Sequence, residues 1–242
     1  MFVDGGEDGA RHCWVADACI EVSGGPPDKR VGKVLGYGIH EPAKKPDFDA
    51  IFDIFAQENI TDIRFRVPPT PNMAEIIEWL TERGFRRVTK AIQLLASTEP
   101  ERPVVTEYLI RRIGEEDAVQ FAEIIFKNYA NRTPEAFAHY KSKLVTPDVT
   151  CFMAFDGETP IGTGVINSHG LGCAFGYGTT LGPYRKRGLQ NAMIAYRLNY
   201  ARTMGHDWAC ALTFGNDRSS RNLQRQGFKK AYELLIYGNA AK

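Results

Sequence analysis

Apolar residues recur along the second half of the chain with two different spacings. Between residues 149 and 181 they form short runs separated by turn residues such as Asp156-Gly157, which is typical of β-strands. In the next segment they fall at the spacing of one helix face: Leu189, Ala192, Met193, Tyr196 and Tyr200. The pattern predicts, in order, strand 104–113, helices 115–128 and 134–144, strands 149–155, 160–166 and 173–181, helix 189–204, strand 207–214, short helix 219–226 and last strand 231–237.

The first half of the chain repeats part of this pattern. Gly36-Tyr37-Gly38 ends one apolar run and Gly176-Tyr177-Gly178 lies in another, at an offset of 140 residues. Farther on, one helical pattern leads into Gly84 and another into Gly227, at an offset of 143, and each glycine precedes Phe, two basic residues and an apolar strand. Two landmarks in the same order favour an internal duplication.

A polar stretch with two prolines and two acids, residues 98–103, predicts a linker between the halves. We therefore expect a first domain over residues 1–97, the linker over 98–103, and a second domain over 104–242. The first domain has no counterpart of the two helices predicted over 115–144, so we expect it to be an incomplete copy.

A basic turn follows the strand over 173–181. It reads Tyr184-Arg185-Lys186-Arg187-Gly188-Leu189-Gln190 and opens the helix that begins near Leu189. The first N–H groups of a helix have no partner within it, and the helix dipole adds positive potential at that end. Such a turn is suited to a pyrophosphate. The corresponding loop of the first half, residues 40–46, has two prolines and no glycine, so we expect no anion site there.

Composition narrows the classes of function. Lys plus Arg number 30 and Asp plus Glu 29, a net charge of +1, which argues against a general nucleic-acid binder. No apolar run approaches the ~20 residues of a membrane span, and no secretory signal opens the chain. The five cysteines are scattered and the five histidines lack metal-ligand spacing, so we expect a cytoplasmic protein with reduced thiols and no metal.

Two of these stretches resemble motifs of the GNAT superfamily of acetyl-CoA-dependent N-acetyltransferases. Arg185–Gln190 is similar to the acyl-CoA loop [Q/R]-x-x-G-x-[G/A], although Gln190 stands where a small residue is usual. The stretch from Asn216 to Phe228 is similar to the later strand-to-helix motif of the family. The resemblance covers residues 104–242 and implies an α/β (α+β) fold with a mixed, mostly antiparallel sheet flanked by helices. The first half would be a degenerate GNAT-like copy.

The resemblance also implies a cofactor site. Acetyl-CoA would be the cosubstrate, with pantetheine in a wedge between the strand ending at Thr180 and the strand over 207–214. The residues expected to bind it are Gly178, Thr179, Thr180, Leu181, Arg185, Lys186, Arg187, Gly188, Leu189, Gln190, Asn216 and Asn222.

The catalytic groups are less defined. Many relatives carry a tyrosine four residues before the glycine of Gly-Phe, where this chain has Leu223. Ser219 is a hydroxyl that could protonate the thiolate, or it could cap the short helix. Tyr177 shares a strand face with Phe175 and Thr179 by period two, and is either at the reacting centre or in the core.

We therefore expect an N-acetyltransferase whose partner is a primary amine of a small molecule or peptide, with no nucleic-acid or membrane partner. A homodimer is compatible with the sequence. The alternative is a non-catalytic acyl-CoA-binding or regulatory protein of the same fold, which Leu223 favours. A tandem acyltransferase using an aminoacyl-tRNA donor is a third hypothesis, which the near-neutral charge opposes. Nothing in the sequence identifies the acceptor amine.

Overall fold

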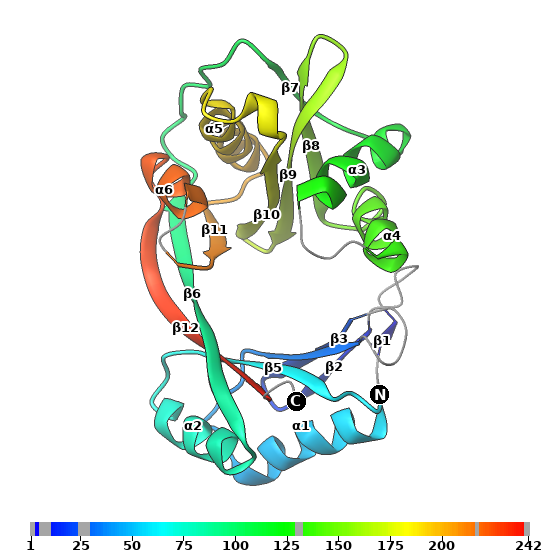
Figure 1. The fold of residues 1–242 in the computed structure, drawn as a ribbon. Helices are drawn as coiled ribbons and strands as arrows, with labels where there is room; N and C mark the ends of the chain where they lie inside the picture. Colours follow the sequence, from blue (N-terminus) through cyan, green and yellow to red (C-terminus); the bar gives the residue numbers. More distant parts are fainter. Residues whose placement is uncertain (1–2, 5–10, 24–29, 129–132, 216–217, 240–242) are drawn as a thin grey trace. The chain divides into compact units, whose positions relative to one another are not determined.

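The computed structural model of the chain describes residues 3–4, 11–23, 30–128, 133–215 and 218–239 (Figure 1). The chain divides into two compact units. One comprises Met1–Ile92 with Tyr232–Lys242, and the other comprises Gln93–Ala231. Within the described ranges, no helix is long and apolar enough to cross a membrane.

The first unit is a sheet covered by two helices. Its strands are, in order across the sheet, β1 (Val3–Asp4), β2 (Arg11–Val15), β3 (Ala18–Val22), β4 (Val31–Leu35), β5 (Asp62–Val67), and parts of β12 (Lys229–Asn239) and β6 (Phe85–Ser97). Strands β1 to β4 are antiparallel, β4 and β5 are parallel, and β5 and β12 are antiparallel. Helices α1 (Lys45–Gln57) and α2 (Met73–Glu82) share one core with this sheet.

The helical spacing of aromatic residues explains how α1 packs. Phe48 and Phe55 are buried, and the Phe48 ring lies 5.4 Å from that of Trp79 on α2. The helix begins at Lys45, with Pro46 in its first turn, where a missing N–H costs nothing. Asp47 also lies in this first turn, where a negative charge is favourable near the helix N-terminus.

The second unit has helices on both faces of its sheet (Figure 1). Its strands are, in order, part of β6, β11 (Trp208–Thr213), β10 (Gly172–Thr180), β9 (Thr159–His169), β8 (Val149–Asp156) and β7 (Leu109–Arg112). The helices are α3 (Ala118–Asn128) and α4 (Pro134–Ser142) on one face, and α5 (Leu189–Thr203) and α6 (Arg218–Arg225) on the other. Only β10 and β11 pair in parallel among the registered strand pairs of this unit. The predicted mixed, mostly antiparallel sheet flanked by helices is confirmed.

Strand β8 shows how both faces are buried. Its side chains alternate, as a strand requires: Cys151 and Met153 pack with α3 and α4, whereas Phe152 meets the ring of Tyr200 on α5 at 5.0 Å. The sequence of a strand that is covered on both faces is a nearly continuous apolar run. The predicted first strand over 104–113 is shorter in the structure, because only Leu109–Arg112 pairs with β8.

The two halves repeat one order of elements, and the last strand of each half lies beside a strand of the other half. The order β4-α1-β5-α2-β6 recurs as β10-α5-β11-α6-β12. Strand β12 pairs with β5 in the register Leu235↔Val67, and β6 lies next to β11. The described residues before α1 form no helix. The compact units therefore differ from the predicted domains: residues 232–242, assigned to the second, lie in the first.

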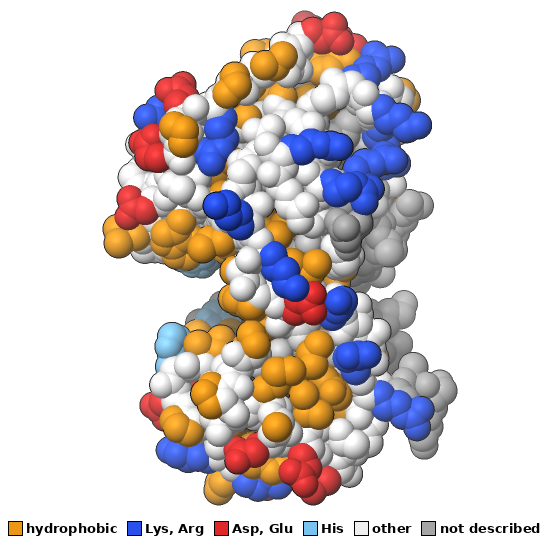
Figure 2. All heavy atoms as spheres, turned by 90° about the vertical axis from the view of Figure 1, so that its left-hand side faces the viewer, with side chains coloured by type: hydrophobic (Ala, Val, Ile, Leu, Met, Phe, Trp, Pro, Cys, Tyr) orange, Lys and Arg blue, Asp and Glu red, His pale blue; other side chains and the backbone are white. Residues whose placement is uncertain are grey.

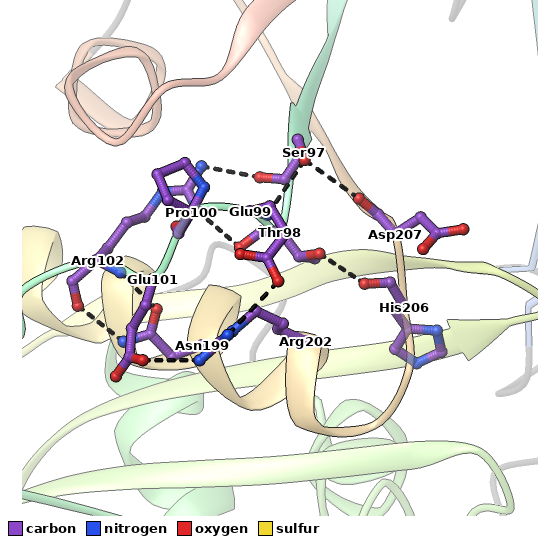
Figure 3. Close-up of polar contacts among 10 residues, drawn as sticks. All are labelled: Ser97, Thr98, Glu99, Pro100, Glu101, Arg102, Asn199, Arg202, His206 and Asp207. Carbon is purple, nitrogen blue, oxygen red and sulfur yellow. Dashed lines mark hydrogen bonds and ion pairs between the residues drawn. The ribbon is translucent and has the colours of Figure 1, made fainter.

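The predicted linker is tied to the second unit by hydrogen bonds (Figure 3). The Arg102 guanidinium donates to the carbonyl oxygens of Ser97, Thr98, Pro100 and Gln226 at 2.8–3.0 Å. The Asn199 side chain on α5 bonds both the N–H and the C=O of Arg102, each at 2.8 Å. These contacts satisfy the backbone of a proline-rich segment that cannot join a sheet. The composition of this segment predicted a linker, and the hydrogen bonds of Arg102 hold that linker in a defined path.

Candidate functional site

A cleft opens where β10 and β11 part. The two strands pair in parallel from Gly172↔Trp208 to Phe175↔Ala211, and no pair is registered beyond that point although both strands continue. The space has a volume of about 780 Å³. Its lining is Asn128, Gly178, Thr179, Thr180, Tyr184, Arg185, Lys186, Gly188, Leu189, Gln190, Asn191, Leu212, Thr213, Phe214, Arg218, Ser219, Arg221, Asn222 and Arg225. The cleft lies where the sequence placed the wedge, and most of the expected cofactor residues meet in it.

Glycine at 188 forms the entry to α5. Its φ is +79°, the left-handed region, and a Cβ built there would meet no atom within 4 Å. The backbone therefore requires glycine for its conformation, and the space above it is open. The first helical hydrogen bond runs from the N–H of Ala192 to the C=O of Gly188, so the preceding amides of this turn have no partner within the helix. The lining residues include Gly188, Leu189, Gln190 and Asn191, which brings these amides to the cleft wall.

The three basic residues of the turn take different positions. The Arg185 guanidinium donates to the Thr180 carbonyl at 3.1 Å and to Asn128 Oδ1 at 2.7 Å, so it is held at the rim of the cleft. Lys186 lines the cleft. Arg187 does not: it donates to the Tyr108 hydroxyl at 3.3 Å, and that hydrogen bond raises its pKa. Arg187 is therefore not among the described residues that line the cleft.

Two further residues that were expected to bind the cofactor, Gln190 and Leu181, make contacts within the protein. Gln190 Oε1 accepts from the Thr180 hydroxyl at 3.2 Å, and a Cβ built on Gly178 would lie 2.7 Å from Gln190 Nε2. The Gln190 side chain therefore occupies part of the wedge. The N–H of Leu181 donates to the carbonyl of Ile161 at 2.9 Å, and its side chain packs into the core under α3 and α4. Leu181 is thus a half-buried residue that packs against the core, and its amide is already bonded.

A β-bulge turns Tyr177 to the opposite face from Phe175. The register with β9 shifts between Gly176 and Thr179, and Tyr177 has a φ of +46°. The Phe175 ring packs against Phe228 at 5.7 Å, whereas the Tyr177 ring packs against Tyr140 on α4 at 5.7 Å. The predicted period-two alignment of Tyr177 with Phe175 is therefore wrong, because the bulge adds a residue to β10.

The Tyr177 hydroxyl meets a histidine that the sequence did not single out. His139 Nε2 lies 3.0 Å from it, and both side chains are half-buried. The counterpart Tyr37 in the first unit has a structural role, since its hydroxyl bonds the N–H and C=O of Lys44 at 2.9 and 2.6 Å. His139 lies on a helix whose apolar residues show only a weak helical periodicity. The sequence pattern therefore could not indicate that its side chain contacts a strand.

A buried arginine supports the bulge. Arg197 on α5 is 2% exposed and donates to the carbonyl oxygens of Val165 and Gly176 at 3.1 and 3.3 Å. Its guanidinium also lies over the Phe175 ring, 4.3 Å from the centroid. The sequence carried a signal for it, because Arg197 stands on the apolar face of a helix where a charge must find partners inside.

The remaining residues of the expected site lie on α6 and just before it. The helix begins at Arg218, so Ser219 lies in its first turn rather than before it, exposed and lining the cleft. Asn222 lines the cleft and accepts from Arg225 at 3.1 Å. Leu223, where relatives were expected to have tyrosine, is 5% exposed. Asn216 falls outside the described residues.

In the first unit, side chains of the protein accept hydrogen bonds from the backbone amides of the loop that corresponds to the basic turn. The Asp17 carboxylate accepts from the N–H groups of Gly38, His40 and Glu41 at 2.8–3.3 Å. Asn72 Oδ1 accepts from the N–H of Ala43 at 3.3 Å. Several amides of this loop are thus bonded to side chains of the protein.

This arrangement predicts a stability effect that is separate from ligand binding. Partial burial acts to raise the pKa of Asp17, but hydrogen bonds from backbone amides, among them those of Gly38 and His40, hold it below its ordinary value. Asp17→Ala should lower the free energy of unfolding by about 1–3 kcal/mol at pH 7. The carboxylate contributes this stability above its unfolded pKa of about 3.9, and the contribution is lost as pH falls through the lower folded pKa.

Urea unfolding at pH 7 and in acid measures this effect, with Asp53→Ala, an exposed acid on α1, as the matched control. The deficit of Asp17→Ala should shrink at low pH, and acetyl-CoA affinity should be unchanged. A deficit that is equal at every pH would contradict the assigned role of the charge.

No protein-family model and no curated protein matches the sequence. Several solved structures resemble the fold. A GCN5-related N-acetyltransferase from Kribbella flavida has a TM-score of 0.71 at 15% identity, covering 96% of this chain and 90% of that one. One from Sphaerobacter thermophilus has 0.67 at 10%, covering 92% and 76%. A tandem GNAT protein from the clavulanic acid biosynthesis pathway has 0.65 at 11%, covering 96% and 83%. The chain has the fold of the GCN5-related N-acetyltransferases, as the sequence resemblance predicted.

Proposed function

We propose that this chain is an N-acetyltransferase that moves an acetyl group from acetyl-CoA to a primary amine of a small molecule or peptide in the cytoplasm. The observation that carries the proposal is the cleft beside the glycine-led start of α5, with open space above Gly188 and a basic lining. The five free cysteines agree with a reducing compartment.

The cleft fits the cofactor in two respects. On the side that faces β11, no pair is registered for β10 after Phe175 in the part of the chain that the structure describes, which leaves backbone groups of Gly178 to pair with the amides of pantetheine, whereas the Thr180 carbonyl already accepts from Arg185. The amides that open α5, with Lys186, suit the diphosphate. Arg187 is not needed for this, since it bonds Tyr108. When bound, the cofactor supplies an activated thioester; the chain has to hold it and move protons.

We assign the proton on the amine side to Tyr177 and His139. As the amine nitrogen bonds to the acetyl carbon and the C–S bond breaks, Tyr177 would take the surplus proton of the amine and pass its own to His139 Nε2, 3.0 Å away. An imidazole nitrogen within hydrogen-bond distance of the hydroxyl can accept its proton. Ser219, exposed on the cleft wall, would protonate the departing thiolate directly or through water.

Calorimetric titration of the full chain with acetyl-CoA tests the cofactor assignment, and thiol release over a panel of polyamines, amino acids, aminoglycosides and peptide N-termini tests turnover. We expect micromolar binding and turnover with at least one amine class. Lack of binding at millimolar acetyl-CoA would contradict the proposal.

A second candidate is a non-catalytic acyl-CoA-binding protein. Leu223 favours it, because the position expected to carry an acid is an apolar residue packed into the core. The two candidates differ in one result: binding of acetyl-CoA without turnover on the whole amine panel would favour the second.

A further inference from the structure

One arginine of α5 lies inside the second unit. Figure 2, which views the side on which Figure 1 draws α5 and α6, shows Lys and Arg side chains on the surface of the molecule. Arg197, in contrast, is buried, and its guanidinium donates to the carbonyl oxygens of Val165 on β9 and Gly176 on β10. Burying a charge costs free energy unless the charge gains such partners. Because these carbonyls belong to two paired strands, the guanidinium holds the sheet at the point where the bulge begins.

The guanidinium fills the place that a regular β10 would give to Tyr177. If the strand continued from the pair Gly176↔Val165 without a bulge, the next residue of β10 would lie opposite Gly164. Paired residues of an antiparallel ladder point to the same face of the sheet. A Cβ built on Gly164 would lie 2.9 Å from Arg197 Nε, so Tyr177 in that register would compete with Arg197 for the same space. The bulge avoids this overlap, because it turns the tyrosine ring to the face that α4 covers.

Two buried side chains hold the backbone of the bulge itself. The carbonyl of Gly176 accepts from Arg197 at 3.3 Å, and the carbonyl of Tyr177 accepts from the Thr163 hydroxyl at 2.8 Å. Both donor side chains are buried. Tyr177 has a φ of +46°, which a bulky residue adopts only where its surroundings impose it. The two hydrogen bonds supply that constraint, because they fix the peptide groups on either side of the Tyr177 Cα.

We propose that Arg197 and Thr163 are positioning residues, which hold the bulge so that the Tyr177 hydroxyl reaches His139. The inference rests on the proposed function, because it assumes that this pair moves the proton of the amine. Neither positioning residue is among the described residues that line the cleft. Each acts through the backbone of Tyr177. Loss of either hydrogen bond should therefore affect the step that uses the Tyr177 hydroxyl, and the binding of acetyl-CoA much less.

Arg197→Met and Thr163→Val test the inference in steady-state kinetics of the full chain with an amine that turns over. Methionine fills much of the same space without a donor, and valine has the shape of threonine without the hydroxyl. Each variant should lower kcat about tenfold or more and keep the KM for acetyl-CoA within about threefold of the wild-type value. In the background of Tyr177→Phe, each should change kcat by less than about twofold, because the hydroxyl that they position is gone.

Arg202→Met is the matched control, since it is the same change on the same helix. Arg202 is not among the described residues that line the cleft, and it pairs with Glu99 and Glu101. The variant should melt at a lower temperature than the wild type and keep kcat within about twofold. Thermal melting shows which variants are folded. If Arg197→Met does not fold, Thr163→Val alone decides the inference.

The imidazole NMR spectrum reports the contact between His139 and Tyr177 without turnover. The spectrum of His139→Gln assigns the His139 signal. In Arg197→Met and Thr163→Val this signal should move toward its position in Tyr177→Phe, whereas Arg202→Met should leave it in place. An unmoved signal in the folded variants, or a loss of kcat of equal size with and without the Tyr177 hydroxyl, would overturn the inference and leave the proposed function standing. A wild-type protein that binds no acetyl-CoA and turns over no amine would overturn both.

Discussion

Replacing Gly188 with glutamate should weaken acetyl-CoA binding more than about a hundredfold while leaving the chain folded. A carboxylate at this position would stand where the open space above the start of α5 now lies. At a few ångströms from a diphosphate, like charges repel by roughly 3–4 kcal/mol at a surface-like effective dielectric. The change also forces a non-glycine residue to adopt φ near +79°. Calorimetric titration gives the affinity directly.

The same helix supplies the control. Gly205, just past the end of α5, has φ of +82° and no atom within 4 Å of a built Cβ. Gly205→Glu therefore introduces the same side chain, charge and backbone strain outside the cleft. It should bind acetyl-CoA like the wild type. If Gly188→Glu binds equally well, the diphosphate does not lie at the start of α5.

Replacing Tyr177 with phenylalanine should lower kcat about a hundred- to a thousandfold with little change in the KM for acetyl-CoA, the range for loss of a general acid–base group. The ring and its packing against Tyr140 remain, and only the hydroxyl that meets His139 is lost. Steady-state kinetics with any amine that turns over measures the effect. Tyr140→Phe, the same change in the same cluster, should keep kcat within about threefold.

His139→Gln gives an independent readout of the same pair. Glutamine can still hydrogen-bond the Tyr177 hydroxyl, so the packing is kept while the titratable ring is lost. We expect kcat to fall about tenfold or more while the KM for acetyl-CoA stays close to the wild-type value. Full activity of the variant would show that the contact between the two side chains only stabilises the fold.

Much of the second unit could be predicted because its local signals agree with one another. The apolar run over β8 and the spacing along α5 place their side chains correctly, since burial on both faces of a strand and on one face of a helix leaves direct traces in the sequence. Gly188 was expected in the cofactor loop because a basic, glycine-containing turn at a helix start suits a pyrophosphate.

The remaining features depend on contacts between distant residues. A bulge at Tyr177 has no strong local signal, and it overturns a period-two prediction by adding one residue. Asp17 bonds amides more than twenty residues away, and Arg102 reaches the carbonyl of Gln226 across 124 residues. Periodicity could not predict the departure of β12 to the other unit either, because a strand has the same pattern whichever neighbour it joins.

The placement of β12 bears on how the chain is made in the cell. Until β12 has left the ribosome, the edge of β5 lacks the strand that pairs with it at Leu235↔Val67. At about 5–20 residues per second, this edge would wait roughly ten to thirty seconds during synthesis. An uncovered strand edge can pair with other chains. The nascent first half is therefore the stage at which this protein would benefit most from a chaperone.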